Sequence, residues 1–226
     1  MKTLFLRSVT FRSCTATIAL LLSLSFQARA ITLNFQGLDG TVINFATNST
    51  FGFTSTTNGY QFSISSVIGG LGDSVNLDGY VAPGGPFTIG SITTIGGLET
   101  APVTGTGTLH ITDNAATDLT GTINWVSIAT ISVAGVLNLS GQVNLTGITY
   151  PGANSDLNAL AAAASGSDVV TFQFVPPQTL TQLTTTGGRT SYSGSITSVP
   201  EPGTWVLVAM GTGLGVFLRG RKQARR

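Results

Sequence analysis

Residues 136–148 read VLNLSGQVNLTGI, and this stretch decides the fold class. One set of alternate positions is apolar or small: Leu137, Leu139, Gly141, Val143 and Leu145. The other set is polar and uncharged: Asn138, Ser140, Gln142, Asn144 and Thr146. A period of two places the two sets on opposite faces of a β-strand. The pattern is typical of an antiparallel sheet with one packed and one hydrated face.

Weaker forms of this alternation recur along the chain. In four further segments, the apolar face of the expected strand is formed by Ile31, Leu33 and Phe35; by Tyr60, Phe62 and Ile64; by Leu109 and Ile111; and by Val170, Phe172 and Phe174. Turn signals separate them at Asp39-Gly40, Asn58-Gly59, 82–86 and Gly187-Gly188. We therefore predict an all-β fold, a single antiparallel β-sandwich or jelly-roll-like domain over residues 31–198. One helix is expected, in which Ser155 or Asp156 caps a run through Ala164.

Charge is strongly segregated along the chain. Nine of the ten basic residues lie in the first 30 or the last eight residues. Between residues 31 and 198, Arg189 is the only cation against eight carboxylates, a formal charge of −7. The carboxylates belong to Asp39, Asp73, Asp78, Glu99, Asp113, Asp118, Asp156 and Asp168. A body with one cation cannot neutralise many phosphates, so we expect no nucleic-acid partner.

The first 30 residues have the layout of a secretory signal peptide. A cationic leader, MKTLFLRSVTFRS, precedes an apolar stretch, CTATIALLLSLSF, and small residues come after it at Ala28 and Ala30. This order predicts cleavage after Ala30. An uncleaved anchor helix is the weaker alternative, because the apolar stretch falls short of the ~20 residues that a span needs. Cys14 is the only cysteine and lies in this leader, so we expect a mature chain without disulfides or thiol chemistry.

Residues 31–198 contain few candidates for catalysis. His110, the only histidine, falls on the polar face of GTLHIT, and this segment has no cysteine or lysine to complete a nucleophilic site. We interpret it as an exposed strand residue. Asp113 and Asp118 flank the loop DNAATD and are the only pair we consider for a glycan-cleaving enzyme, although Asp is also common in turns. We assign no catalytic residue and expect a protein that is not an enzyme.

We expect no cofactor and no metal ion. A surface calcium site is a weak alternative. The stretch SVNLDG, residues 74–79, offers oxygen ligands at alternate positions and a glycine at the turn. It lacks an acid at its first position, and Gly85 stands where a closing glutamate would be. Val75 and Leu77 between the ligands favour a strand with a packed face instead.

Aromatic residues suggest a sugar-stacking platform as a second binding feature. The candidates are Tyr60, Tyr80, Tyr150, Tyr192 and Trp125. Trp125 is in step with Ile123, which favours a position in the core.

Residues 199–226 read VPEPGTWVLVAMGTGLGVFLRGRKQARR. Pro200 and Pro202 restrict the backbone and separate the domain from the apolar run after them. As a helix, that run, residues 204–218, is about 22 Å long, short for a ~30 Å hydrocarbon core, yet flanking arginines can reach the interface. We predict a transmembrane helix here. The basic residues after it favour the cytoplasmic side and place the body outside. They are Arg219, Arg221, Lys222, Arg225 and Arg226.

This tripartite tail, together with the signal peptide, resembles the PEP-CTERM proteins of Gram-negative bacteria. Pro200, Glu201 and Pro202 match the motif, residues 204–218 match the membrane segment, and the five basic residues match the stop. The resemblance implies recognition by an exosortase, a membrane enzyme thought to cleave near the motif and pass the protein to the cell surface or extracellular matrix. It covers only residues 199–226 and the signal, so it predicts routing and not the role of the body.

Three functions are compatible with these features. The leading one is a non-enzymatic secreted protein, exported across the inner membrane, anchored there transiently and then released to the cell surface, associated with exopolysaccharide or the cell envelope. The alternatives are a carbohydrate-binding module and a glycan-cleaving enzyme that uses Asp113 and Asp118.

Overall fold

The computed structural model describes residues 30–131, 139–163 and 165–198. The described strands are β1 (Thr32–Gly37), β2 (Ile43–Ala46), β3 (Thr50–Phe53), β4 (Phe62–Ile68), β5 (Asp78–Ala82), β6 (Phe87–Ile89), β7 (Thr93–Ile95), β8 (Leu98–Thr104), β9 (Thr106–Thr112), β10 (Asp118–Ile131), β11 (Leu139–Thr149), β12 (Ser165–Phe172), β13 (Gly188–Thr190) and β14 (Tyr192–Ser198). The described helices are α2 (Ser155–Ala162) and α3 (Leu180–Thr186).

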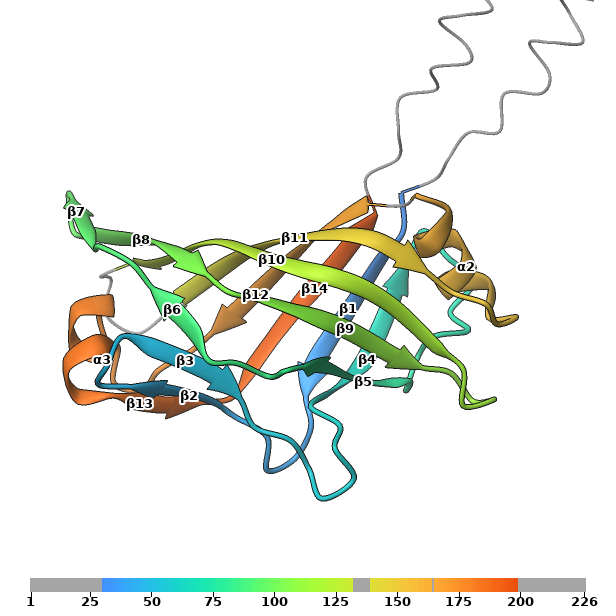
Figure 1. The fold of residues 1–226 in the computed structure, drawn as a ribbon, viewed down its shortest axis with the longest axis horizontal. Coiled ribbons are helices and arrows are strands. Elements are labelled where there is room, and N and C mark those ends of the chain that lie inside the picture. The colour runs from blue at the N-terminus through green and yellow to red at the C-terminus, as the bar shows by residue number, and fades with distance from the viewer. Residues whose placement is uncertain (1–29, 132–138, 164, 199–226) are drawn as a thin grey trace, which may run out of the picture. The chain divides into compact units, whose positions relative to one another are not determined.

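Eight of the strands close into an antiparallel barrel (Figure 1). The order around the ring is β10, β11, β12, β14, β1, β4, β5, β9 and back to β10. The predicted all-β, antiparallel class is confirmed, but the predicted sandwich or jelly roll is replaced by this closed ring. Alternation along a strand reports which face is packed and not which strand is the neighbour, so it could not distinguish the two. Closure leaves no unpaired edge around the ring.

A second, smaller sheet branches from β10 where that strand changes partner. Asp118–Asn124 pair with β9, whereas Ser127–Ile131 pair with β8. On the other side of β10, its register against β11 shifts between Trp125 and Ser127. From β8 the order continues through β6, β3 and β2 to β13, with β7 also paired to β8. Phe51 of this sheet packs edge-on against Trp125 of the barrel, with ring centroids 4.9 Å apart. The two parts therefore share one apolar core.

The barrel interior pairs large side chains with glycines on neighbouring strands. Gly141 lies under the ring of Trp125, and Gly194 lies beside the ring of Phe35. A Cβ atom at either glycine would come within 2.5 Å of those rings, too close for any other residue without a shift. Small and large residues thus alternate across the ring, which is how a narrow barrel fills its interior. The alternation in residues 141–145 is confirmed, because Gly141, Val143 and Leu145 are buried while Gln142 and Asn144 are exposed.

The predicted helix is confirmed, with Asn154 as its cap in place of Ser155 or Asp156. The Asn154 side chain accepts hydrogen bonds from the backbone of Asp156 and Leu157, and the helix ends at Ala162. The second helix, α3, was not expected from the sequence. Its capping box between Thr179 and Gln182 is a sequence signal that could have indicated it.

The strand predicted over residues 74–79 is wrong for its first half. Ser74–Asn76 form a turn, Asn76 has φ +68°, and the strand begins only at Asp78. Leu77 is buried as expected, but Val75 is 37% exposed. The left-handed backbone at Asn76 breaks the alternation, and Asn is a residue that tolerates this conformation.

Candidate functional site

The two predicted targeting segments join the barrel at one seam. The Ile31 N–H donates to Ser198 Oγ at 2.8 Å, and the Ser198 N–H donates to the Ile31 carbonyl at 2.9 Å. Because β1 and β14 are antiparallel neighbours, the start of the first strand lies beside the end of the last (Figure 1). The chain therefore enters β1 and leaves β14 at the same end of the barrel.

Most residues assigned to sorting lie outside the described residues. These are Ala28, Pro200, Glu201, Pro202, Arg219, Arg221, Lys222, Arg225 and Arg226, with the predicted membrane helix 204–218. Ala30, the predicted cleavage position, is described and exposed directly before β1. Across the described residues, no helix combines the length and apolar character needed to cross a membrane.

Four adjacent barrel strands, β11, β12, β14 and β1, present an outer surface that we call the neutral face. Its outward residues are Gln142, Asn144, Thr146, Ser165, Ser167, Val169, Thr171, Ser193, Ser195, Thr197, Thr32, Asn34 and Gln36. None is charged, and all but Val169 carry a hydroxyl or amide. Neighbouring strands share hydrogen bonds across the face, such as Thr32 with Thr197 at 3.0 Å and Thr171 with Ser193 at 3.1 Å.

An aromatic cluster lies on the outer surface of β5 and β9. Tyr80 stacks on His110 with ring centroids 4.5 Å apart and planes 1° from parallel, and Tyr60 meets Tyr80 at 6.2 Å. His110 Nδ1 lies 3.1 Å from Asp118 Oδ2 on β10. Burial and the charge of Asp118 raise the pKa of Tyr80. His110 stands on the polar face of a strand, as expected, but it is half-buried under Tyr80 and not exposed.

The two acids considered for glycan cleavage have separate partners. Asp113 accepts a hydrogen bond from the Tyr150 hydroxyl and from the backbone of Ala115 and Thr117. The Tyr150 bond, and then that from Thr117, lowers the pKa of Asp113. A carboxyl held in its ionised form is poorly suited to act as a general acid. Asp113 thus caps the β9–β10 turn, while Asp118 pairs with His110.

Of the oxygens considered for calcium, the Ser74 hydroxyl takes part in fixing the loop between β4 and β5. Asp156, only 1% exposed, accepts from the Leu71 N–H at 2.6 Å and from the Ser74 N–H at 3.1 Å. The Ser74 hydroxyl donates to Asn154 Oδ1 at 2.9 Å. Within residues 30–131, 139–163 and 165–198, no group of three or more His, Cys, Asp or Glu side chains is placed to hold a metal ion.

The predicted aromatic platform is dispersed by the fold. Tyr192 is buried at 5% exposure and donates from its hydroxyl to the Gln61 carbonyl at 2.6 Å. Trp125 is 7% exposed, which confirms its expected place in the core. Tyr150 is engaged with Asp113, so only Tyr60 and Tyr80 of the candidates form an outer cluster.

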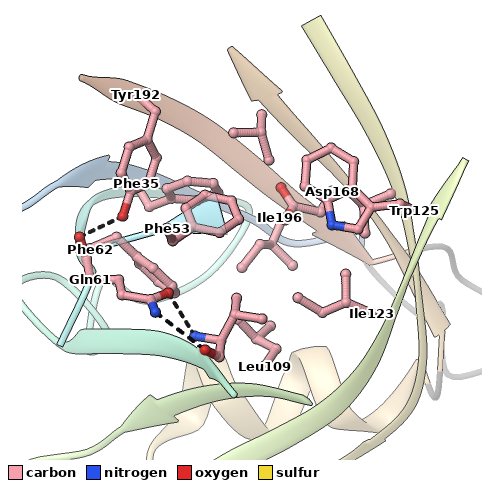
Figure 2. A pocket seen from close by; sticks show the side chains of 13 residues that line it. Phe35, Phe53, Gln61, Phe62, Leu109, Ile123, Trp125, Asp168, Tyr192 and Ile196 are labelled. Atoms are coloured by element: carbon pink, nitrogen blue, oxygen red, sulfur yellow. Dashed lines mark hydrogen bonds between the residues drawn. The ribbon is translucent and has the colours of Figure 1, made fainter. Parts of the chain in front are cut away.

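Two hollows stand out among the described residues. An open groove of about 360 Å³ runs over β2 and β3 beside the Gly84–Pro86 loop, and its polar side chains are Asn44, Thr50 and Thr54. A cavity of about 20 Å³ lies inside the barrel, where Asp168 and Trp125 are among the lining side chains (Figure 2). Sequence reasoning did not single out Asp168, because an inward carboxylate cannot be recognised until the strand register is known.

Comparison with known proteins identifies only the tail. Residues 198–222 match the family model of the PEP-CTERM protein-sorting motif. This match includes Pro200, Glu201 and Pro202 and the first three of the five basic residues. No curated protein and no solved structure matches the chain. The motif implies processing by an exosortase and export toward the cell envelope or surface. The chain is thus a protein that carries a PEP-CTERM sorting motif at its carboxyl end.

Proposed function

We propose that the barrel is a non-enzymatic surface protein that associates with exopolysaccharide or the cell envelope after its delivery through the sorting motif. The observation that supports this association is the neutral face, which is built from hydroxyl and amide side chains on four adjacent strands. A polysaccharide strand offers many hydroxyl groups, and uncharged hydrogen-bonding groups can exchange water for them at low desolvation cost.

The seam between Ile31 and Ser198 is consistent with release from a temporary membrane anchor. The segment 204–218 holds the precursor at the inner membrane, and cleavage near Pro200-Glu201-Pro202 removes it. Ser198 is the last residue of β14, so this cleavage falls outside the barrel and leaves its strand pairing complete. The same holds for signal removal after Ala30, which precedes β1.

Deletion of Pro200-Glu201-Pro202 tests the sorting step. We expect the full-length precursor to accumulate in the inner-membrane fraction instead of reaching the surface. Delivery of the deletion variant at the level of the unaltered protein would contradict the route. Mass spectrometry of the surface-exposed protein should find a carboxyl end close to the motif and no residues from 204–218.

Alanine substitution of Asn144, Ser167 and Ser195 tests the association. The three side chains lie on the neutral face, and together their loss should weaken retention on exopolysaccharide by roughly tenfold. The matched control replaces three exposed loop residues, Thr57, Asn58 and Asn114, by alanine. Equal retention of the two triple variants in a co-sedimentation assay would argue against the neutral face as the contact surface.

The aromatic cluster supports a second candidate, a carbohydrate-binding module. Tyr60, Tyr80 and His110 supply ring surfaces beside the Asp118 carboxylate, a combination that suits stacking and hydrogen bonding to a sugar ring. We expect Tyr80→Ala to abolish glycan-array binding, with Thr108→Ala on the neighbouring strand β9 as the control. Binding that survives Tyr80→Ala, or no binding on any array, would remove this candidate.

A further inference from the structure

Two polar groups at the cavity inside the barrel are buried without a partner among the described residues. They are Trp125 Nε1 and Asp168 Oδ1. Trp125 is on β10 and Asp168 on β12, and each pairs in register with Val143 of the intervening strand β11. The three side chains form a row across the inner wall, and both polar residues line the 20 Å³ cavity (Figure 2). Buried donors and acceptors are nearly always satisfied by protein or by ordered water.

The other polar side chains around the cavity already have partners. Gln61 accepts from the Val81 N–H at 2.9 Å and donates to the Val81 carbonyl at 3.2 Å. Tyr192, the other titratable lining residue, donates its hydroxyl to the Gln61 carbonyl. The remaining lining residues are aliphatic or phenylalanine. Among the lining side chains, only Trp125 and Asp168 therefore carry a buried polar atom that has no partner.

Size and chemistry restrict what the cavity can bind. About 10–15 Å³ of such volume is enough for one water molecule, which needs at least two polar partners. The volume of about 20 Å³ is too small for a sugar ring or another organic ligand. A calcium or magnesium ion requires about six oxygen ligands, and one carboxylate among apolar side chains cannot supply them.

We propose that this cavity is a binding site for one structural water, which accepts from the Trp125 indole N–H and donates to the Asp168 carboxyl. The arrangement satisfies both orphaned groups at once and links β10 to β12 across β11. Burial raises the pKa of Asp168 to about 8, so at pH 7 the carboxyl is mostly neutral and offers a carbonyl oxygen as acceptor. A neutral carboxyl also avoids the cost of an unpaired charge in the core.

Nuclear magnetic resonance of the full chain in detergent, with ¹⁵N-labelled tryptophan, tests the site at pH 6. The indole resonance of Trp125 is assigned with Trp205→Phe, which removes the only other tryptophan. We expect a cross peak between the Trp125 indole proton and water with the sign of a long-lived, buried molecule. Its absence from the unaltered protein would overturn the proposal.

Two variants at Asp168 test whether the cross peak arises instead from the Asp168 carboxyl proton. This proton exchanges with water and could therefore carry the water signal to the indole proton. Asp168→Asn removes that proton but keeps a carbonyl oxygen, so the cross peak should persist. Asp168→Leu keeps the branched shape of the side chain but removes the acceptor and fills part of the cavity with methyl groups, so the cross peak should fall at least fivefold. Loss of the cross peak in Asp168→Asn would also overturn the proposal, since it would assign the signal to the carboxyl proton. If Asp168→Leu does not fold, the unaltered protein and Asp168→Asn still decide the question.

Discussion

Ile31 and Ser198 exchange two hydrogen bonds and thereby close the barrel where its first and last strands meet. Both residues are buried, at 1% and 2% exposure. The two residues lie next to the segments predicted to be removed, yet each belongs to the fold by its contacts. Cleavage at either of the two predicted positions would therefore fall close to a structurally important bond.

Ser198→Ala should destabilise the barrel because it leaves the buried Ile31 N–H without its acceptor. We expect a loss of about 1–3 kcal/mol in the free energy of unfolding, measured by urea denaturation. Ser195→Ala on the outer surface of the same strand is the control and should change stability by no more than about 0.5 kcal/mol. Equal effects of the two substitutions would show that the seam contributes nothing specific.

Asp168→Asn should change how stability depends on pH. Below about pH 4 the carboxyl is protonated in both states, and between pH 4 and about 8 only the unfolded chain releases the proton. The folded state then binds more protons, so the unfolding free energy of the unaltered protein falls by up to about 1.4 kcal/mol per pH unit in this window. Above pH 8 this group causes no further loss.

The difference between the two proteins isolates Asp168, since all other titrating groups are shared. Tyr192, the other titratable group that lines the cavity, stays protonated in this window, because burial raises its pKa. We expect the unfolding free energy of the asparagine variant to rise relative to that of the unaltered protein from pH 4 to pH 8. Parallel stability profiles in urea titrations would contradict a buried neutral carboxyl.

Gly141→Ala should destabilise the barrel through a clash with Trp125. The added Cβ would lie 2.5 Å from Cζ3 of the indole, so the ring must move within a packed core. We expect a loss of about 1–3 kcal/mol and a shift in tryptophan fluorescence. Because the contact involves the six-membered ring of the indole, Trp125→Phe should reduce the effect in the double variant. Simple additivity of the two substitutions would argue against this contact.

Asp156→Ala should release the loop between β4 and β5. Two backbone N–H groups, of Leu71 and Ser74, lose their acceptor. We expect a loss of about 2–4 kcal/mol, with faster hydrogen exchange at both amides. Asp73→Ala, at an exposed position of the same loop, is the control. Unchanged exchange at Leu71 and Ser74 would refute the anchoring role of Asp156.

Local sequence patterns predicted those features that depend on neighbouring residues. The alternation in residues 141–145 placed Val143 and Leu145 inside and Asn144 outside, and the structure confirms it. The helix after Asn154 was also predicted, apart from the identity of its cap. The α3 helix was missed because a short run rich in threonine has weak helical propensity, and Leu180 and Leu183 hold it by packing into the core.

For the candidate sites too, the sequence predicted what depends on neighbouring residues and missed what depends on strand pairing. His110 was placed on a polar strand face from its neighbours, but its stacking on Tyr80 and its pairing with Asp118 depend on strands β5, β9 and β10 lying side by side. The aromatic platform was only partly right, because register turned Tyr192 inward while leaving Tyr80 outward.

The sequence by itself determined the β class, the segregation of charge to the two ends and the sorting motif. All three can be recognised from the residue types in local stretches of the chain. Only the tertiary structure decided that the sheet closes, that Ile31 meets Ser198, and that Asp168 points into the barrel beside Trp125. These depend on which strands pair and in what register. Pairing is a choice among distant segments, governed by how glycines and large side chains fit together inside the ring.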